Sequence, residues 1–291
     1  MSALPLLTVE DLHVSYQGRS GRVPALRGVS FEVGQERLGI VGESGSGKST
    51  IGLSVLRLLP GTASLAATRL ALRGIDLLHA TESALRTVRG RRISMVLQDP
   101  KFSLNPVLTV GQQIAESYAV HAHSTRHEAK RKALEMLEAV RIRDPERVFG
   151  LYPHEVSGGM GQRVMIAMML IPEPDFLIAD EPTSALDVTV QAQLLELIDE
   201  LIRRRQMGLI LISHNLNLVA SFCDRILVLY GGRVMEMLNA SELASARHPY
   251  TRGLLACRPL IDRPQAELPQ LKRDLAWLSE PVGAGVARTR D

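Results

Sequence analysis

Residues 42–50, GESGSGKST, fit the pattern G-x-x-x-x-G-K-[ST] and follow an apolar run that ends in Ile40 and Val41. A strand, a tight turn and a helix start are the context that this pattern requires. Backbone N–H groups in such a turn attract a polyphosphate to the positive end of the helix, and glycines allow close approach. We therefore expect a phosphate loop in which Lys48 reaches the outer phosphates and Ser49 is a ligand of Mg²⁺.

A second chemical signature is an acidic pair at the end of the apolar segment FLIADE, residues 176–181. Asp180 ends the predicted strand and is placed to hold magnesium through water, as the Walker-B acid does in phosphate-loop proteins. Glu181, one residue beyond this metal ligand, is the better candidate for the base that orients and polarises an attacking water.

Between these sites lies SGGMGQR, residues 157–163, followed by an apolar helical run. A serine N-cap followed by two glycines exposes a bare helix N-terminus, which is again an anion site. One phosphate loop already serves the chain's own nucleotide, so the simplest interpretation is contact with a nucleotide held by another subunit. The residues assigned to this contact are Ser157, Gly158, Gly159 and Gln162.

Composition and charge favour an ordinary globular protein. The chain has 291 residues, of which 45% are hydrophobic and 22% are charged, so at roughly 150 residues per domain it holds one large domain or one with an appendage. Its net charge is +3 and its basic clusters, 89–92 and 203–205, are short. We expect solvated helix ends there and no nucleic-acid partner. The two cysteines, Cys223 and Cys257, are too few for a four-thiolate site, and we expect packing residues and no iron–sulfur cluster.

No secretory leader pattern is visible at the start of the chain, and we expect the chain to stay in the cytoplasm. The longest apolar stretch, Val164 to Ile171, is far shorter than the about 18–20 residues needed to span a bilayer. Any membrane role must therefore depend on a partner.

The elements that position these motifs follow from periodicity. Residues 7–16 and 28–41 predict antiparallel strands that lead into the loop. A turn at Pro60-Gly61, a strand, a helix over 82–88 and a strand over 93–97 follow. Residues 109–120 and 125–140 are helical by spacing and indicate an inserted helical subdomain. Strands and helices then alternate, which favours a parallel sheet covered by helices; they are expected at 176–179, 188–205, 209–212, 216–223 and 225–230. From residue 258 onward we expect a partly ordered extension.

Taken together, the ordered motifs resemble an ABC-type ATPase, the nucleotide-binding subunit of a transporter, over roughly residues 7–238. The resemblance implies an α/β fold: a P-loop NTPase core with a parallel sheet, an antiparallel β subdomain and an inserted helical subdomain. It places the ATPase domain at 1–240, with the helical subdomain at about 105–170, and a C-terminal extension at 241–291. The nucleotide-binding residues that it implies besides Tyr16, the aromatic that stacks on adenine, are Gly42, Glu43, Ser44, Gly45, Ser46, Gly47, Lys48, Ser49 and Thr50.

Three further roles are implied only by this resemblance. Gln98 senses magnesium and the attacking water at the contact with membrane subunits, Asp187 lies across the dimer seam, and His214 reaches the terminal phosphate. The implied catalytic residues are thus Glu181, His214 and Gln98, the metal ligands Ser49, Gln98 and Asp180, and the cofactors ATP and Mg²⁺.

A finer resemblance is carried by SLNPVLTVGQQI (103–114), YPHEVSGGMGQRVMIAM (152–168) and HPYTRGLL (248–255). These stretches are similar to ATP-binding subunits of oligopeptide, dipeptide and nickel importers. The resemblance implies a peripheral subunit at the cytoplasmic face of the inner membrane. Its partners would be a second ABC ATPase subunit, identical or paralogous, two membrane-spanning permeases and an external substrate-binding protein. Peptide import is favoured over import of nickel or a metal chelate, and a soluble ABC ATPase without membrane partners is a further alternative.

Two positions depart from the family pattern. Gly161 stands where these relatives usually carry Arg, and Asn215 follows the switch histidine where Asp is usual. Glycine lowers helix propensity by about 1 kcal/mol relative to alanine. Either change is compatible with a weaker or asymmetric ATP site, so a protein that holds ATP without hydrolysing it is another alternative.

Overall fold

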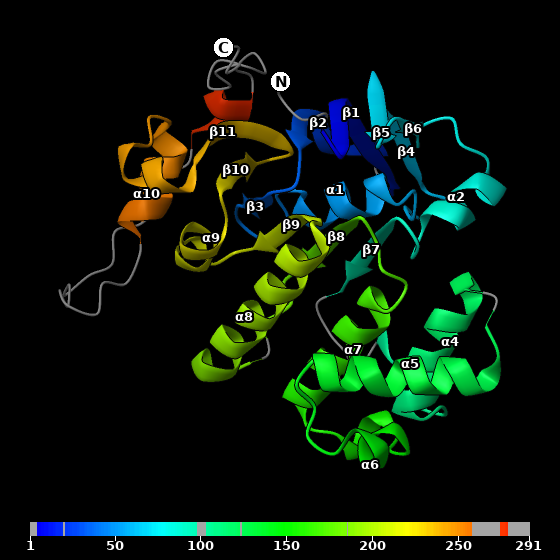
Figure 1. The fold of residues 1–291 in the computed structure, drawn as a ribbon. Helices are drawn as coiled ribbons and strands as arrows, with labels where there is room; N and C mark the ends of the chain where they lie inside the picture. The colour runs from blue at the N-terminus through cyan, green and yellow to red at the C-terminus, as the bar shows by residue number, and fades with distance from the viewer. Residues whose placement is uncertain are drawn as a thin grey trace. The chain divides into compact units, whose positions relative to one another are not determined.

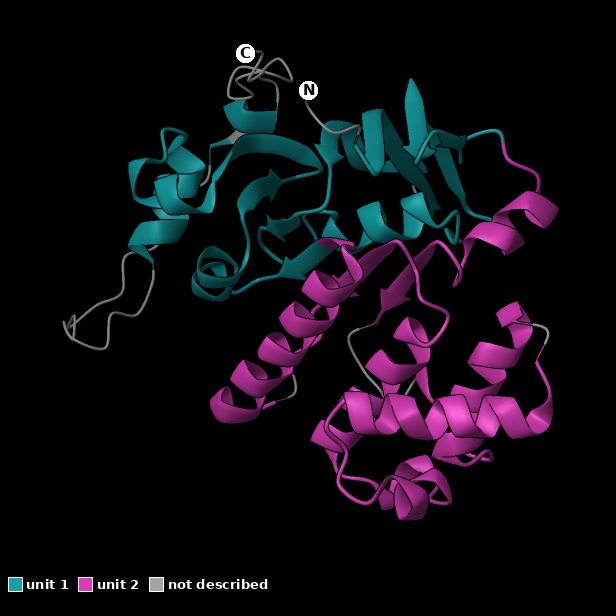
Figure 2. Ribbon diagram, in the orientation of Figure 1, with its two compact units in different colours: residues 1–79, 210–291 teal, residues 80–209 magenta. Residues whose placement is uncertain are grey.

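The computed structural model describes residues 5–19, 21–97, 103–122, 124–184, 186–257 and 274–278. The chain divides into two units, one formed by residues 1–79 and 210–291 and the other by residues 80–209 (Figures 1 and 2). The phosphate loop belongs to the first unit, and the acidic pair and the SGGMGQR segment belong to the second.

The first unit contains an antiparallel sheet in the order β2-β1-β5-β6, with β4 also paired to β1 (Figure 1). Alternating apolar residues of β1, including Leu7, Val9, Leu12 and Val14, are buried, because successive side chains of a strand point to opposite faces. The strands are β1 (Leu7–Gly18), β2 (Gly21–Val33), β4 (Ala63–Ala66), β5 (Arg69–Leu72) and β6 (Ile75–Asp76).

A second group of strands in this unit surrounds the segment that leads into the phosphate loop. Strand β3 (Arg37–Val41) pairs in parallel with β10 (Arg225–Tyr230), and β10 pairs antiparallel with β11 (Arg233–Asn239). The β3 and β9 (Gly208–Ser213) segments are almost wholly buried, as strands covered on both faces must be. The helical elements of the unit are α1 (Lys48–Val55), α9 (Leu216–Phe222), η2 (Ala240–Ser245), α10 (Pro249–Ala256) and η3 (Leu275–Leu278).

The second unit combines a parallel strand pair with helices. Strand β7 (Ile93–Val96) pairs with β8 (Phe176–Asp180), with Ile93 opposite Phe176. Side chains of Thr81, Thr125 and Asp187 cap three of the helices by accepting backbone N–H bonds, which satisfies donors that have no partner within a helix. The helices are α2 (Glu82–Val88), α4 (Val110–Ala122), α5 (Arg126–Ala139), α6 (Pro145–Phe149), η1 (Pro153–Glu155), α7 (Gly158–Leu170) and α8 (Val188–Arg205).

Most predicted elements agree with the structure, one differs in part, and two elements were not predicted. The helices over 82–88 and 188–205 and the strand over 225–230 are confirmed. The antiparallel strand expected from residue 28 is confirmed as far as Val33 in β2, which begins already at Gly21. Beyond Val33 the expectation is wrong, because residues 37–41 form a separate strand, β3, that pairs in parallel with β10. Strand β11 and helix α10 were not predicted. Among the helices of the described ranges, none combines the length and apolar character that crossing a membrane requires.

An ion pair joins the start of β3 to the start of β10. The Arg37 guanidinium donates to both carboxylate oxygens of Asp224, at 2.7 and 3.2 Å, and the Arg37 backbone N–H donates to the same carboxylate at 2.8 Å. The Asp224 N–H donates in turn to the Arg37 carbonyl at 2.8 Å. The guanidinium also lies 5.3 Å from the centroid of the Phe222 ring. This two-pronged geometry holds the two parallel strands in register where both begin.

We predict that Asp224→Asn lowers the free energy of unfolding by about 1–2 kcal/mol, because one charge-assisted bond is lost while the size of the side chain is kept. Urea denaturation of the two proteins measures the difference. The matched control is Glu196→Gln. Glu196 lies on the surface of α8, where its carboxylate pairs with Arg141, and its loss is expected to leave the free energy of unfolding unchanged. Equal free energies of unfolding for Asp224→Asn and wild type would show that the Arg37–Asp224 pair does not stabilise the pairing of β3 with β10.

Candidate nucleotide site

The turn between β3 and α1 has the close backbone packing that a phosphate loop needs. A Cβ at Gly42 would lie 2.1 Å from the Leu229 carbonyl oxygen. Gly47 has a φ of 100°, and a Cβ there would lie 2.7 Å from the Ala25 carbonyl oxygen. Any other residue at these two positions would collide with backbone or adopt a strained conformation, so the glycines of the motif are explained by the structure itself.

Lys48 is folded into this turn. Its ammonium is buried and donates to the Gly42 and Glu43 carbonyl oxygens, at 2.9 Å each. Helix α1 begins at Lys48 with Gly47 as its N-cap and with no side chain accepting from its first N–H groups. Because these donors and the ammonium converge on one loop, the residues present fit an anionic polyphosphate. Within the described residues, the buried Ser46 hydroxyl has no hydrogen-bond partner.

The remaining residues assigned to the nucleotide lie around this loop. Ser44, Gly45 and Ser49 are exposed, as a ligand-facing surface requires. The Tyr16 hydroxyl of β1 lies 3.5 Å from the Thr50 hydroxyl of α1, and the Tyr16 ring is partly exposed. The first unit therefore brings Tyr16 to the helix that follows the loop.

The acidic pair ends strand β8 as predicted. Asp180 is buried, whereas Glu181 is partly exposed and has a φ of 47°. A left-handed conformation is uncommon for a residue other than glycine, and such strain is concentrated at functional sites. The turn after Glu181 is held from both sides: the Gln162 amide donates to the Pro182 carbonyl, and the Gln191 amide donates to the Thr183 hydroxyl at 2.9 Å.

The SGGMGQR segment forms the N-terminus of α7. The Ser157 hydroxyl accepts from the Met160 N–H at 3.3 Å and caps the helix. Ser157 and Gly158 are exposed, and a Cβ at Gly158 would meet no atom within 4 Å. Gln162 lies on the buried side of the same helix, so the structure separates an exposed helix tip from a glutamine that supports the turn after Glu181.

The residues assigned by resemblance are placed unevenly. Asp187 caps α8 by accepting from the Val190 N–H at 3.0 Å. His214 is exposed directly after β9. Asn215 caps α9 by accepting from the Asn217 and Leu218 N–H groups, at 3.1 and 3.2 Å, so the asparagine that departs from the family pattern meets the local needs of the helix. Gln98 lies outside the described residues.

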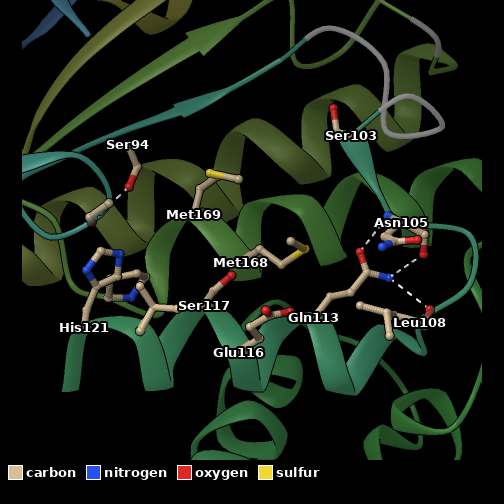
Figure 3. A pocket seen from close by; sticks show the side chains of 13 residues that line it. Ser94, Ser103, Asn105, Leu108, Gln113, Glu116, Ser117, His121, Met168 and Met169 are labelled. Carbon is tan, nitrogen blue, oxygen red and sulfur yellow. Dashed lines mark hydrogen bonds between the residues drawn. The ribbon is translucent and has the colours of Figure 1, made fainter. Parts of the chain in front are cut away.

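Sequence reasoning missed a groove in the second unit. It has a volume of about 440 Å³ and lies between the segment 103–108, helix α4 and the end of α7. Figure 3 shows Gln113 of α4 bonded to the loop: its amide donates to the Asn105 and Leu108 carbonyls at 3.0 Å each. Met168 and Met169 line the opposite wall (Figure 3). The lining comes from separate segments, so no single stretch of sequence signals it.

The pKa of one group that lines the groove, His121, is lowered from its ordinary value. Burial, and secondarily the charge of Arg91, lower the pKa of His121 at the end of α4. A Cβ at Gly90 would lie 2.3 Å from the His121 ring, which explains how closely this ring is packed. Burial and the neighbouring Arg91 charge therefore both favour the neutral form of the His121 imidazole.

Comparisons with known proteins identify the family of the chain. The sequence profile of the ABC transporter family matches residues 26–184, which include the phosphate loop, the SGGMGQR segment and the acidic pair. A probable peptide ABC transporter ATP-binding protein of Sinorhizobium fredii is 50% identical over 95% of this chain and 84% of its own length. The dipeptide transport ATP-binding protein DppD of Bacillus subtilis is 46% identical over 90% of this chain and 79% of its own length.

Solved structures are similar in fold. The protein cbiO1 of Clostridium perfringens, described as part of the ABC transporter complex cbiONQ, superimposes with a TM-score of 0.71 at 26% identity, over 86% of this chain and 95% of its own. The ATP-binding cassette MJ0796, described as dimeric and bound to ADP and Pi, gives a TM-score of 0.70 at 25% identity, over 80% and 98% of the two chains. The predicted fold class is thus confirmed, and the chain belongs to the ABC transporter family.

Proposed function

We propose that this chain is the ATP-hydrolysing subunit of a membrane importer for oligopeptides or dipeptides. The observation that carries the proposal is the phosphate loop, where glycine-dependent packing brings a buried lysine and the open N-terminus of α1 together. The peptide class is supported by the relatives, which are named for peptide, dipeptide and oligopeptide transport. No feature of the described residues favours nickel or a metal chelate over a peptide.

The motor is a pair of such subunits, with one ATP held between the phosphate loop of each subunit and the helix tip of the other. The exposed Ser157 and Gly158 support this arrangement, because a helix N-terminus at the surface is available to an anion on a second molecule. A relative of the same fold is described as a dimer. ATP binding closes the pair. Hydrolysis then reopens it, because the two anionic products, ADP and phosphate, repel each other.

Catalysis rests on positioning and electrostatics. Lys48 neutralises charge on the outer phosphates, Glu181 accepts a proton from the water that attacks the terminal phosphorus, and His214 contacts the terminal phosphate. The bond from phosphorus to the bridging oxygen breaks, and ADP and phosphate leave. Residues suited to hold Mg²⁺ are Ser49, Asp180 and Gln98; when bound, this ion offsets the negative charge of the phosphates.

The membrane partners are two permeases, fed by an external substrate-binding protein, and this subunit is peripheral at the cytoplasmic face of the inner membrane. We assign the groove of α4 and α7 to the permease contact. Exposed Val120 lines this groove, and exposed Val107 belongs to the segment 103–108 that forms one side of it. A short amphipathic helix of a permease loop fits such a groove, because apolar anchors then cover exposed valines.

Glu181→Gln is expected to lower ATP turnover by about 10²–10⁴-fold, because the amide cannot take the proton of the attacking water. ATP binding is retained, because the phosphate loop is unchanged. Phosphate release and binding of a fluorescent ATP analogue measure the two properties, with the surface change Glu196→Gln as the control. Turnover at the wild-type rate in Glu181→Gln would remove Glu181 as the base.

Gly158→Asp tests the paired arrangement. A side chain fits there without touching its own subunit, so folding and ATP binding by the monomer stay normal, while a carboxylate repels the partner's triphosphate. In the Glu181→Gln background, sedimentation with Mg-ATP is expected to give a dimer that Gly158→Asp reduces to a monomer. The control is Gly61→Asp, at another glycine with open space. A Gly158→Asp protein that still dimerises with ATP contradicts the arrangement.

Val120→Arg tests the permease contact. Val120 is 65% exposed, so the subunit folds and binds ATP as before, but a charge now stands where an apolar anchor has to pack. We expect peptide uptake by the reconstituted transporter to fall by about tenfold or more, since one buried unpaired charge costs well over 1.4 kcal/mol. Ile75→Arg, an exposed apolar position on β6, is the control. Normal uptake with Val120→Arg would place the contact elsewhere.

A further inference from the structure

The HPYT segment, which the proposed reaction leaves without a role, reaches the phosphate loop. Tyr250 of α10 is fully buried, and its hydroxyl accepts a hydrogen bond from the Glu43 backbone N–H at 3.2 Å. The two residues are 207 positions apart in the chain, yet both belong to the first unit. A tyrosine from the C-terminal region thus contacts the first peptide after Gly42.

Glu43, which donates to Tyr250, also accepts a hydrogen bond from Lys48. The Glu43 carbonyl accepts from the Lys48 ammonium at 2.9 Å and from the Ser46 N–H at 3.1 Å. Tyr250 therefore holds the N–H side of a residue whose carbonyl side holds Lys48. A shift of this peptide would move the ammonium and the inner turn of the loop together.

The phenol is itself held in place from strand β11. The buried Glu236 carboxylate accepts from the Arg247 and His248 N–H groups, at 2.7 and 3.2 Å. His248 Nδ1 then accepts from the Tyr250 N–H at 3.1 Å and caps α10, with Pro249 in its first turn. Three hydrogen bonds and Pro249 thus fix the start of α10, so the Tyr250 hydroxyl is preorganised to bond the loop.

Aromatic rings complete this arrangement. The Tyr250 ring lies 4.7 Å from the Tyr230 ring and 5.8 Å from the Trp277 ring, centroid to centroid. Trp277 also lies 5.7 Å from Tyr230 and 5.7 Å from His248, and it is the single tryptophan of the chain. We call Tyr230, His248, Tyr250 and Trp277 the aromatic cluster. Packing alone would be served by phenylalanine at position 250, whereas the hydroxyl also bonds the cluster to the loop.

We propose that Tyr250 is a positioning residue that sets the conformation of the phosphate loop, so that the C-terminal segment tunes nucleotide affinity and the aromatic cluster senses nucleotide. The proposal rests on the assignment of this loop to the nucleotide. It predicts that nucleotide binding changes Trp277 emission, because movement of the Glu43 peptide is transmitted through the phenol to the rings around the indole.

The test compares the full chain with Tyr250→Phe. Removal of one hydrogen bond is expected to weaken ADP and ATP binding by about two- to tenfold, and to abolish the change of Trp277 emission on nucleotide addition. The matched control, Tyr118→Phe, removes a phenol that donates to Glu128 in the other unit and leaves both properties unchanged. A role in packing alone would leave the nucleotide-dependent emission change of Tyr250→Phe intact.

The same bond is tested from the loop side. Glu43→Pro removes the N–H and leaves Tyr250 in place, and Glu43→Ala controls for the carboxylate. The proline variant is expected to lose the emission response as Tyr250→Phe does, and Tyr250→Phe is expected to add nothing further in the Glu43→Pro background, since the shared hydrogen bond is already absent there. If Tyr250→Phe does not fold, the Glu43→Pro result decides.

The outcomes separate the two claims. Absence of nucleotide binding by the wild-type chain would overturn the proposed function. Normal binding by wild type, together with an unchanged affinity and emission response in Tyr250→Phe and Glu43→Pro, would overturn the positioning role alone.

Discussion

The buried ammonium of Lys48 is the constraint on which the candidate site depends. A buried cation needs acceptors, and in this chain they are the carbonyls of Gly42 and Glu43, at 2.9 Å each. The loop must curl around the lysine to present them, which brings its backbone against β10 and β2. Glycine at positions 42 and 47 is a consequence of this curl. Triphosphate oxygens are stronger acceptors than neutral carbonyls, so the same lysine is poised for a nucleotide.

Support for the acidic pair comes from neighbouring helices. Glu181 keeps a left-handed backbone conformation because the turn behind it is tied to Gln162 of α7 and Gln191 of α8. Helix α7 therefore carries both an exposed tip at Ser157 and an inward glutamine beside the turn after Glu181. A rotation of α7 would therefore move the exposed tip and the turn after Glu181 together.

The HPYT segment of the C-terminal region also contacts the phosphate loop. Residues 247–250 are anchored on Glu236, and the Tyr250 hydroxyl bonds the Glu43 N–H, so this segment packs within the first unit. The groove of α4 and α7 is similarly a product of packing, since Gln113 shapes the 105–108 loop through bonds to its backbone.

The sequence by itself determined what depends on neighbouring residues: the strand, turn and helix around the phosphate loop, the acidic strand end, the cap at Ser157, and the bounds of α2 and α8. Helix periodicity, caps and glycine turns depend on residues a few positions apart, so they can be predicted from the sequence. Only the tertiary structure decided the break before β3, the pairing of β11, the inward side of Gln162 and the bond between Tyr250 and Glu43. These features join segments that are distant in the chain, and which distant groups meet is set by the packing of the whole unit.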